Sequence, residues 1–370
     1  MVSINTIQEF RPFLESFSRI NGLRKTLIYH IIEWYFSSLI RVIANLGAIM
    51  KRNKKKIDKT KRGRRIFRSF LILSVLLLVT VIGNYLANRE VYVTEYEIFD
   101  EKVPQSFDGY RLVQVTDVHS IRNQEQADLL YSTIVSEQPD AVVITGDLLD
   151  STYYTEENTA LKAGLTEKTA GQDTIDFVKK LTDSYYVYWV YGNHEMILLD
   201  DVDNNPFKVA MEEIGVVFLN NAGVKISKDD EGIYLLGIQD PSTLYKDSAY
   251  AEYDSHTERI NAMMANVMAL KEEDLYTIVL SHRPEYYNEY VKYDVDLIVT
   301  GHAHGGQVRI PGLGGLYAPG QGWFPEYSEG ICQKNEAKPM IIGRGIGNAV
   351  EVPRIFNPPE INTIILRQAD

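Results

Sequence analysis

Five short clusters of Asp, Asn and His stand out in this sequence, because each directly follows an apolar run. Five of the seven histidines of the chain lie in these clusters, and chance placement of that kind is improbable. Carboxylate, amide and imidazole donors together suit Zn, Mn or Fe better than Ca or Mg. The clusters therefore predict a metal site. They are Asp117-Val118-His119, Gly146-Asp147, Gly192-Asn193-His194-Glu195, Ser281-His282 and Gly301-His302-Ala303-His304.

The number of donors favours more than one ion. A lone Asp after a strand often caps the next helix, and a lone His is usually structural, so single members of the set carry little weight. Together the clusters offer more candidate ligands than one ion can bind, whereas two ions that share a bridging carboxylate would use them all. The candidates are Asp117, His119, Asp147, Asn193, His282, His302 and His304.

The apolar run before each cluster is the element that must position it. Short runs of β-branched and aromatic residues are typical of buried strands. Ligands of parallel sheets bind outside the carboxyl ends of the strands. We therefore expect all five clusters at one edge of one sheet. The runs are 112–115, 141–144, 187–191, 277–280 and 297–300.

The rest of the chain after Val91 alternates predicted strands and helices, which predicts a layered α/β sandwich. Met263, Met264 and Met268 are interpreted as core residues rather than cofactor contacts. Segment 151–173 is polar and aperiodic, and we expect a surface loop that could contact substrate. Helices are predicted at 128–138, 174–181, 206–214 and 258–270, and further strands at 216–219, 224–227, 234–238, 340–342 and 361–366.

Charge is distributed very unevenly along the chain. The net charge is -12, but residues 1–68 hold 16 Lys and Arg against 4 Asp and Glu, so the remainder carries -24. An acidic body repels polyanions, so no nucleic-acid partner is expected. Cys332 is the single cysteine, which excludes an intrachain disulfide.

Segment 67–86 is apolar and long enough to span a bilayer as a helix. Segment 51–65, directly before it, holds ten Lys and Arg and one Asp, so the positive-inside rule predicts a cytoplasmic N-terminus and an extracytoplasmic body. A cleaved signal peptide is the alternative, although Asn84 to Asn88 make a poor cleavage site. Segment 27–49 is either an amphipathic surface helix or a weak span.

The resulting organisation is a basic N-terminal region (1–66), a transmembrane helix (67–86), a linker with a first strand (87–109) and one catalytic domain (110–370). Met50, followed at once by basic residues, looks like a natural start. Residues 1–49 are therefore hypothesised to be an upstream extension.

The order of the clusters, with Asp150 completing Gly-Asp-x-x-Asp, resembles the calcineurin-like metallophosphoesterase superfamily over residues 110–370. The run Gly301 to Pro311, with Gly343 to Gly347 and Pro353-Arg354, resembles its bacterial membrane-associated branch, typified by the YkuE and YaeI phosphodiesterases. The fold that this resemblance implies is an α/β/β/α sandwich. The glycines at 343–347 lack a following helix pattern, so a turn beside the site is favoured over a nucleotide loop.

The resemblance also implies a role for each residue. Asp117, His119 and His304 would hold the first metal, and Asn193, His282 and His302 the second, with Asp147 bridging them. His194 would be the catalytic imidazole near the leaving oxygen. Asp150 would support the His194 side chain without binding the metal ions. Glu195 would orient the residues next to it.

The implied activity is hydrolysis of a phosphate ester. Two divalent ions (Mn, Zn or Fe) about 3.5–4 Å apart can generate a bridging hydroxide at neutral pH, and His194 can protonate the departing oxygen. A membrane tether makes a phosphodiester in a lipid or cell-envelope precursor the leading substrate hypothesis. A phosphomonoesterase and a non-catalytic metal-binding scaffold are the alternatives.

Overall fold

The computed structural model describes residues 61–121, 123–150, 172–198, 206–242, 250, 252–334, 337–348 and 352–369. The chain divides into two compact units, Met1–Val81 and Ile82–Asp370. The predictions for 1–49, for most of the basic run 51–65 and for the loop 151–171 lie outside the described residues.

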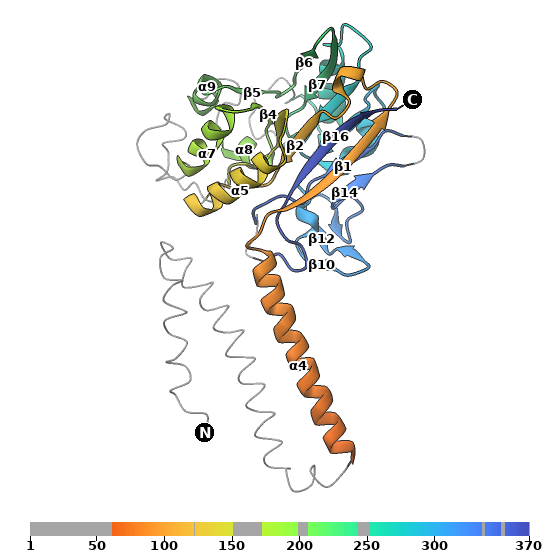
Figure 1. The fold of residues 1–370 in the computed structure, drawn as a ribbon. Helices are drawn as coiled ribbons and strands as arrows, with labels where there is room; N and C mark the ends of the chain where they lie inside the picture. Colours follow the sequence, from red (N-terminus) through yellow and green to blue (C-terminus); the bar gives the residue numbers. More distant parts are fainter. Residues whose placement is uncertain are drawn as a thin grey trace. The chain divides into compact units, whose positions relative to one another are not determined.

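Helix α4 (Lys61–Ala87) is the first described element (Figure 1). Its segment Phe67–Ala87 is apolar and long enough to cross a membrane, and none of it is buried. The predicted span 67–86 therefore ends one residue before the end of the helix at Ala87.

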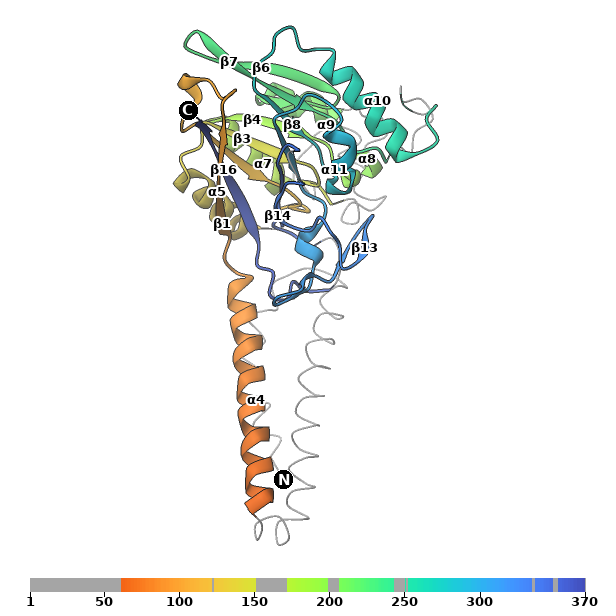
Figure 2. The same ribbon diagram turned by 90° about the vertical axis from the view of Figure 1, so that its right-hand side faces the viewer.

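The second unit contains two mixed six-stranded sheets (Figures 1 and 2). The first has the order β1-β16-β2-β3-β4-β5, in which β2 to β5 are parallel. Its strands are β1 (Tyr92–Asp100), β2 (Arg111–Val115), β3 (Ala141–Thr145), β4 (Tyr186–Val190), β5 (Val216–Phe218) and β16 (Glu360–Gln368).

The second sheet has the order β14-β15-β9-β8-β7-β6, in which β15, β9, β8 and β7 are parallel. Its strands are β6 (Ala222–Lys228), β7 (Glu231–Gly237), β8 (Thr277–Leu280), β9 (Leu297–Thr300), β14 (Gly330–Cys332) and β15 (Met340–Ile342).

The predicted α/β/β/α sandwich is confirmed by the hydrophobic clusters. One cluster joins the two sheets, with Val143 and Leu366 of the first in the same core as Leu235 and Val299 of the second. A second covers the outer face of the first sheet with α5 (Gln124–Ser136), α7 (Gln172–Thr182) and α9 (Pro206–Glu213). A third covers the second sheet with α10 (His256–Met268) and α11 (Tyr287–Tyr290).

The prediction of one sheet edge is wrong. β2, β3 and β4 belong to the first sheet, whereas β8 and β9 belong to the second. Strand periodicity reports burial on both faces but not the neighbouring strand, so it cannot assign a strand to a sheet. The two sheets meet at their carboxyl edges, where the Gln114 side chain donates to the Thr300 carbonyl oxygen at 2.7 Å.

The predicted helices exist. α5, α7 and α10 begin two to four residues earlier than expected, whereas α9 begins at the predicted residue, Pro206. Asn123 caps α5 through the Gln126 N–H, and Ser255 forms a capping box with Glu258 at α10. Met263 and Met264 of α10 are buried in the third cluster and the partly buried Met268 packs against it, as predicted for core residues.

Among the described residues, the second unit also contains α8 (Asn193–Leu198), two small hairpins and three short 3₁₀ segments. The hairpins pair β10 (Arg309–Ile310) with β11 (Gly314–Gly315) and β12 (Tyr317–Ala318) with β13 (Gly322–Trp323). The 3₁₀ segments are η2 (Gln105–Phe107), η4 (Pro284–Tyr286) and η5 (His304–Gly306).

Candidate metal centre

The segments that leave the strands reverse sharply at the carboxyl edges. Non-glycine residues rarely adopt the left-handed backbone region, yet five candidate ligands have φ between 49° and 66°. In an extended strand, residues two apart in sequence share a face but lie roughly 6.6 Å apart along it. The reversal brings them close enough to face the same point. The five are Asp117, His119, Asp147, His302 and His304.

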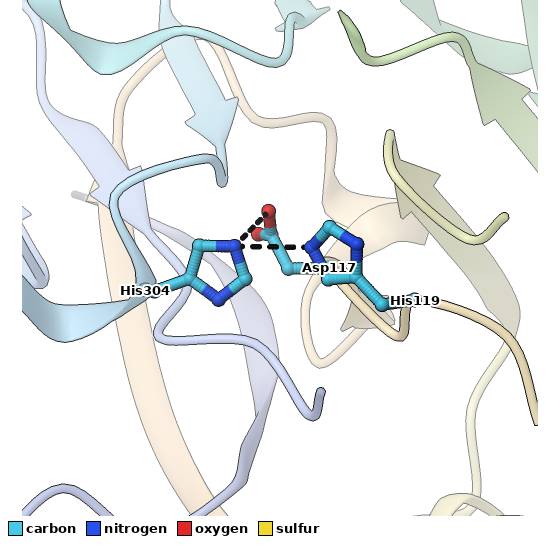
Figure 3. Close-up of side chains that lie close together, drawn as sticks. All are labelled: Asp117, His119 and His304. Atoms are coloured by element: carbon cyan, nitrogen blue, oxygen red, sulfur yellow. Dashed lines mark hydrogen bonds and ion pairs between the residues drawn. The ribbon is translucent and has the colours of Figure 1, made fainter. Parts of the chain in front are cut away.

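One group of donors contains Asp117, His119 and His304 (Figure 3). His304 Nε2 lies 3.1 Å from His119 Nε2 and 3.3 Å from Asp117 Oδ1. Asp117 follows β2 of the first sheet and His304 follows β9 of the second, so this group bridges the sheets.

A second group contains Asp147, His282 and His302. His282 Nε2 lies 3.2 Å from Asp147 Oδ2 and 3.1 Å from His302 Nδ1. The other ring nitrogen of His282 lies 2.8 Å from the Thr145 carbonyl oxygen. Donation to that carbonyl fixes the tautomer that leaves Nε2 free to bind a metal.

A third group links the first two, because it contains His119, Asp147 and His194. Asp147 Oδ2 lies 3.9 Å from His119 Nε2 and 4.0 Å from His194 Nε2. The Nδ1 atom of His194 lies 3.5 Å from Asp150 Oδ1. Asp147 is thus central, since its carboxylate faces donors from all three groups.

Asn193 begins α8 (Asn193–Leu198) directly after β4, beside His194. Its Oδ1 atom is buried and has no hydrogen-bond partner, as is true of His302 Nε2. Buried polar atoms are usually paired. Unpaired buried acceptors of this kind fit a site that takes cations, so the donor set suits divalent metal ions.

Glu195 joins the clusters through the backbone. Its buried carboxylate accepts hydrogen bonds from the N–H groups of Asp147, Leu149 and Gly192, at 2.8–2.9 Å. The Asp147 side chain in turn accepts the N–H of His194 at 2.8 Å. The third cluster therefore holds the second in place through main-chain contacts.

Burial sets the protonation of most of the imidazoles. It lowers the pKa of His119 to about 4 and the pKa values of His302 and His304 well below the usual range. Neutral imidazole is the metal-binding form. His282 differs: burial lowers its pKa, but Asp147 and Asp117 outweigh burial and raise it to about 10, so a metal ion that binds Nε2 would displace a proton.

The pKa values of Asp117, Asp147 and His194 shift in different directions. Burial raises the pKa of Asp117 to about 6 against the influence of His282. Burial acts likewise on Asp147, but His282, His194 and His119 outweigh it and hold the pKa of Asp147 well below its usual range. Burial lowers the pKa of His194, yet Asp150 and Asp147 overcome this effect and raise it.

Several residues around the donors were missed or left without a role by the sequence reasoning. Thr116 Oγ1 donates to Asp117 Oδ2 at 2.8 Å. Arg354 is buried and lies 3.2 Å from His304 Nδ1, and it donates to the carbonyl oxygens of Arg344 and Gly347. The glycine turn 343–347 does lie beside the site, as predicted, because the Gly347 N–H donates to the Asp117 carbonyl oxygen at 2.7 Å.

Residues 110–306 match the calcineurin-like phosphoesterase family. The chain belongs to this family. The match covers more than half of the chain, including all the motifs that bring the donors together. The superfamily resemblance found in the sequence is therefore confirmed, and phosphoester hydrolysis is the family's chemistry.

Three relatives of this phosphoesterase cover most of its length. Bacillus subtilis YkuE, named an uncharacterized metallophosphoesterase, is 25% identical over 78% of this chain and 90% of its own length. A zebrafish (Danio rerio) transmembrane protein with a metallophosphoesterase domain is 24% identical over 92% of this chain and 72% of its own length. The UDP-2,3-diacylglucosamine pyrophosphatase LpxG of Chlamydia muridarum is 23% identical over 78% of this chain and 93% of its own length.

Among solved structures, the NAD nucleotidase NadN of Haemophilus influenzae matches this phosphoesterase with a TM-score of 0.39 at 16% identity. The match covers 64% of this chain but only 45% of NadN.

Proposed function

We propose that this phosphoesterase is a membrane-anchored enzyme that uses two divalent metal ions and prefers phosphodiesters. The observation that carries the proposal is the set of three overlapping donor groups. The group of His119, Asp147 and His194 shares His119 with one of the other two and Asp147 with the other. In this proposal Asp117, His119 and His304 hold one ion. Asn193, His282 and His302 hold the other, and Asp147 bridges the two.

Bound divalent ions would supply Lewis acidity for the phosphoryl oxygens and an activated water. The protein's own contribution centres on His194, which is not needed as a ligand and has a raised pKa. We assign it as the proton donor to the leaving oxygen. Asp150 would hold the imidazole in position from Nδ1, and Glu195 would fix the backbone that carries Asp147, Gly192 and His194.

The membrane part of the proposal rests on α4 and on relatives that are named transmembrane proteins. The basic run before the apolar segment favours a cytoplasmic N-terminus with the catalytic domain on the outer side of the cell membrane. The anchor confines the site to the vicinity of lipid headgroups. A lipid or cell-envelope precursor with a phosphodiester is therefore the favoured substrate class, and the name of the relative LpxG states a diacylated sugar nucleotide, UDP-2,3-diacylglucosamine, as substrate.

The test is a comparison of two soluble esters with the full chain in detergent. The chain is loaded with Mn, Zn or Fe, its metal content is measured, and hydrolysis of bis(p-nitrophenyl) phosphate and p-nitrophenyl phosphate is followed. Faster hydrolysis of the diester, with two ions per chain, is expected.

Faster hydrolysis of the monoester would favour a phosphomonoesterase of the same fold. No hydrolysis of either ester despite bound metal would favour a metal-binding scaffold or a very selective enzyme. A panel of lipid phosphates then tests the substrate class.

A further inference from the structure

Residues 311–324 form a segment of unusual composition. The segment contains no Asp, Glu, Lys or Arg, although 24% of the whole chain is charged. Four of its large apolar side chains are well exposed, Leu313 by 70%, Tyr317 by 47%, Trp323 by 69% and Phe324 by 61%. We call these four residues the hairpin patch. Large exposed apolar patches mark interaction sites with proteins, ligands or membranes.

The two small hairpins hold the patch in place. Leu313 lies in the turn between β10 and β11, and Tyr317 pairs with Trp323 across β12 and β13. The Tyr317 and Trp323 rings meet edge to face with centroids 5.6 Å apart, and the Phe324 N–H donates to the Leu316 carbonyl oxygen. The aromatic rings are thus presented on ordered backbone rather than folded into the core.

The same hairpins are connected to the last turn of α4. The Arg309 N–H donates to the Ile355 carbonyl oxygen at 2.9 Å. The neighbouring Phe356 N–H donates to Asn84 Oδ1 at 2.8 Å, and Asn84 Nδ2 donates to the Arg354 carbonyl oxygen at 2.9 Å. Phe356 is itself half exposed. Asn84 lies three residues before the end of the apolar segment Phe67–Ala87, so a loop bonded to it lies where that segment ends.

The hairpins are also connected to the metal centre. The Gly306 carbonyl oxygen, two residues after His304, accepts the Leu316 N–H at 3.3 Å. Gly306 and Gly315 pack so closely that a Cβ atom on Gly306 would collide with the Gly315 backbone. Backbone contacts therefore connect the patch to the helix end and to a candidate ligand.

We propose that the hairpin patch inserts into the interfacial region of the lipid bilayer that anchors α4, and so holds the metal centre toward the membrane surface. The proposal rests on the anchor in the proposed function. Trp and Tyr prefer the membrane–water interface. The absence of charge in 311–324 fits insertion by apolar burial rather than attraction of a basic surface to anionic lipid.

A fluorescence experiment on the full chain tests the insertion directly. The chain carrying Trp34→Phe is reconstituted into phosphatidylcholine vesicles whose acyl chains are either brominated near the headgroup or unbrominated. Its remaining tryptophans are Trp323 and the fully buried Trp189. We expect brominated lipid to quench the Trp323 emission strongly, and the quenched component to disappear in Trp323→Phe.

The matched control places a tryptophan at an equally exposed position in another part of the unit. Tyr186 is 70% exposed at the amino end of β4, opposite the end that carries the metal donors. The control variant therefore combines Trp34→Phe and Trp323→Phe with Tyr186→Trp, and its new tryptophan is expected to escape quenching. Equal quenching at both positions, or none at Trp323, would overturn the proposal. Chemical cross-linking into dimers with an unquenched Trp323 would assign the patch to a second copy instead.

A kinetic experiment tests whether the patch helps the enzyme to bind a substrate in the bilayer. The double variant Trp323→Ser, Phe324→Ser should keep its rate on bis(p-nitrophenyl) phosphate but show a raised KM for a phosphodiester lipid embedded in vesicles. An equal loss on both substrates would overturn the orienting role and point to damage at the site. The quenching measurement needs neither metal nor turnover, so failure of the proposed hydrolysis and failure of membrane insertion give distinguishable results.

Discussion

The metal centre and the hairpin patch depart from the usual distribution of side chains in opposite directions. Asp117, His119 and Asp147 are charged or polar groups buried almost completely, whereas Trp323 and Phe324 are large apolar groups exposed to more than half. Burying unpaired polar groups and exposing apolar patches both cost stability. Proteins retain such departures mainly where a ligand or a surface compensates for them.

The metal centre and the hairpin patch also differ in the contacts that hold their side chains in place. The donors are fixed by a network that crosses both sheets, with left-handed backbone at five positions. The patch depends on two-residue strand pairs and a few backbone hydrogen bonds. Substitutions at the centre should therefore act on metal and turnover, whereas those at the patch should act on membrane contact alone.

The largest effect is expected for Asp147→Ala. Its carboxylate faces all three donor groups, so its removal should release metal as well as activity. Metal stabilisation of a phosphoryl transition state is worth several kcal/mol, which corresponds to a loss of about 10³-fold or more in kcat. Elemental analysis and hydrolysis of the diester measure both quantities.

The exposed Asp128 on α5 provides the control for this variant, because Asp128→Ala should leave metal and rate unchanged. Retention of both ions by Asp147→Ala would contradict the assignment of Asp147 as the shared ligand.

A large but more selective effect is expected for His194→Ala. The side chain is proposed to donate a proton rather than bind metal, so the variant should keep its ions and lose about 10²- to 10⁴-fold in kcat. Metal content and kcat are compared with those of His256→Ala, which removes a histidine that lies outside the clusters. Full activity of His194→Ala would reject the proton-donor role.

An intermediate effect is expected for Gly192→Ala. A Cβ atom at this position would collide with the Asp147 carboxylate and with its backbone nitrogen. Displacement of a supporting contact typically costs about 10- to 100-fold in metal affinity. Titration with Zn or Mn measures this loss, and Gly83→Ala, where a Cβ meets nothing within 4 Å, is the control. Unchanged affinity would show that the Asp147 position is not set by this contact.

The smallest effect on the folded protein is expected at the patch. The exposed side chains of Trp323 and Phe324 contribute little to the core, so their replacement by Ser should change the free energy of unfolding by no more than about 0.5 kcal/mol. Denaturant unfolding of the double variant in detergent measures the change. A loss of several kcal/mol would make the patch part of the core and would remove its contrast with the metal centre.

The elements next to the motifs could be predicted well from local pattern. The strands 277–280, 297–300 and 340–342 have the predicted bounds, because short apolar runs rich in β-branched residues are typical of strands. The starts of α5 and α10 were misplaced, although the Ser255–Glu258 capping box was present in the sequence. Apolar periodicity locates the middle of a helix, whereas its caps are polar.

The partners of the site could not be predicted in the same way. Glu195 makes its three hydrogen bonds to backbone N–H groups, and backbone groups have no sequence signature. Arg354 contacts His304 from 50 positions away along the chain. Contacts of this kind depend on which loops the sheets bring together.

The sequence by itself determined the donor types, their order along the chain and the strand before each cluster, because these follow from local residue pattern. The tertiary structure decided that the donors come from two sheets rather than one, and that a left-handed turn aims them inward. It also decided that an uncharged surface segment lies beside both the metal centre and the end of the apolar helix. Sheet pairing and loop contacts join residues far apart in sequence, and the energy of those contacts exists only in the folded chain.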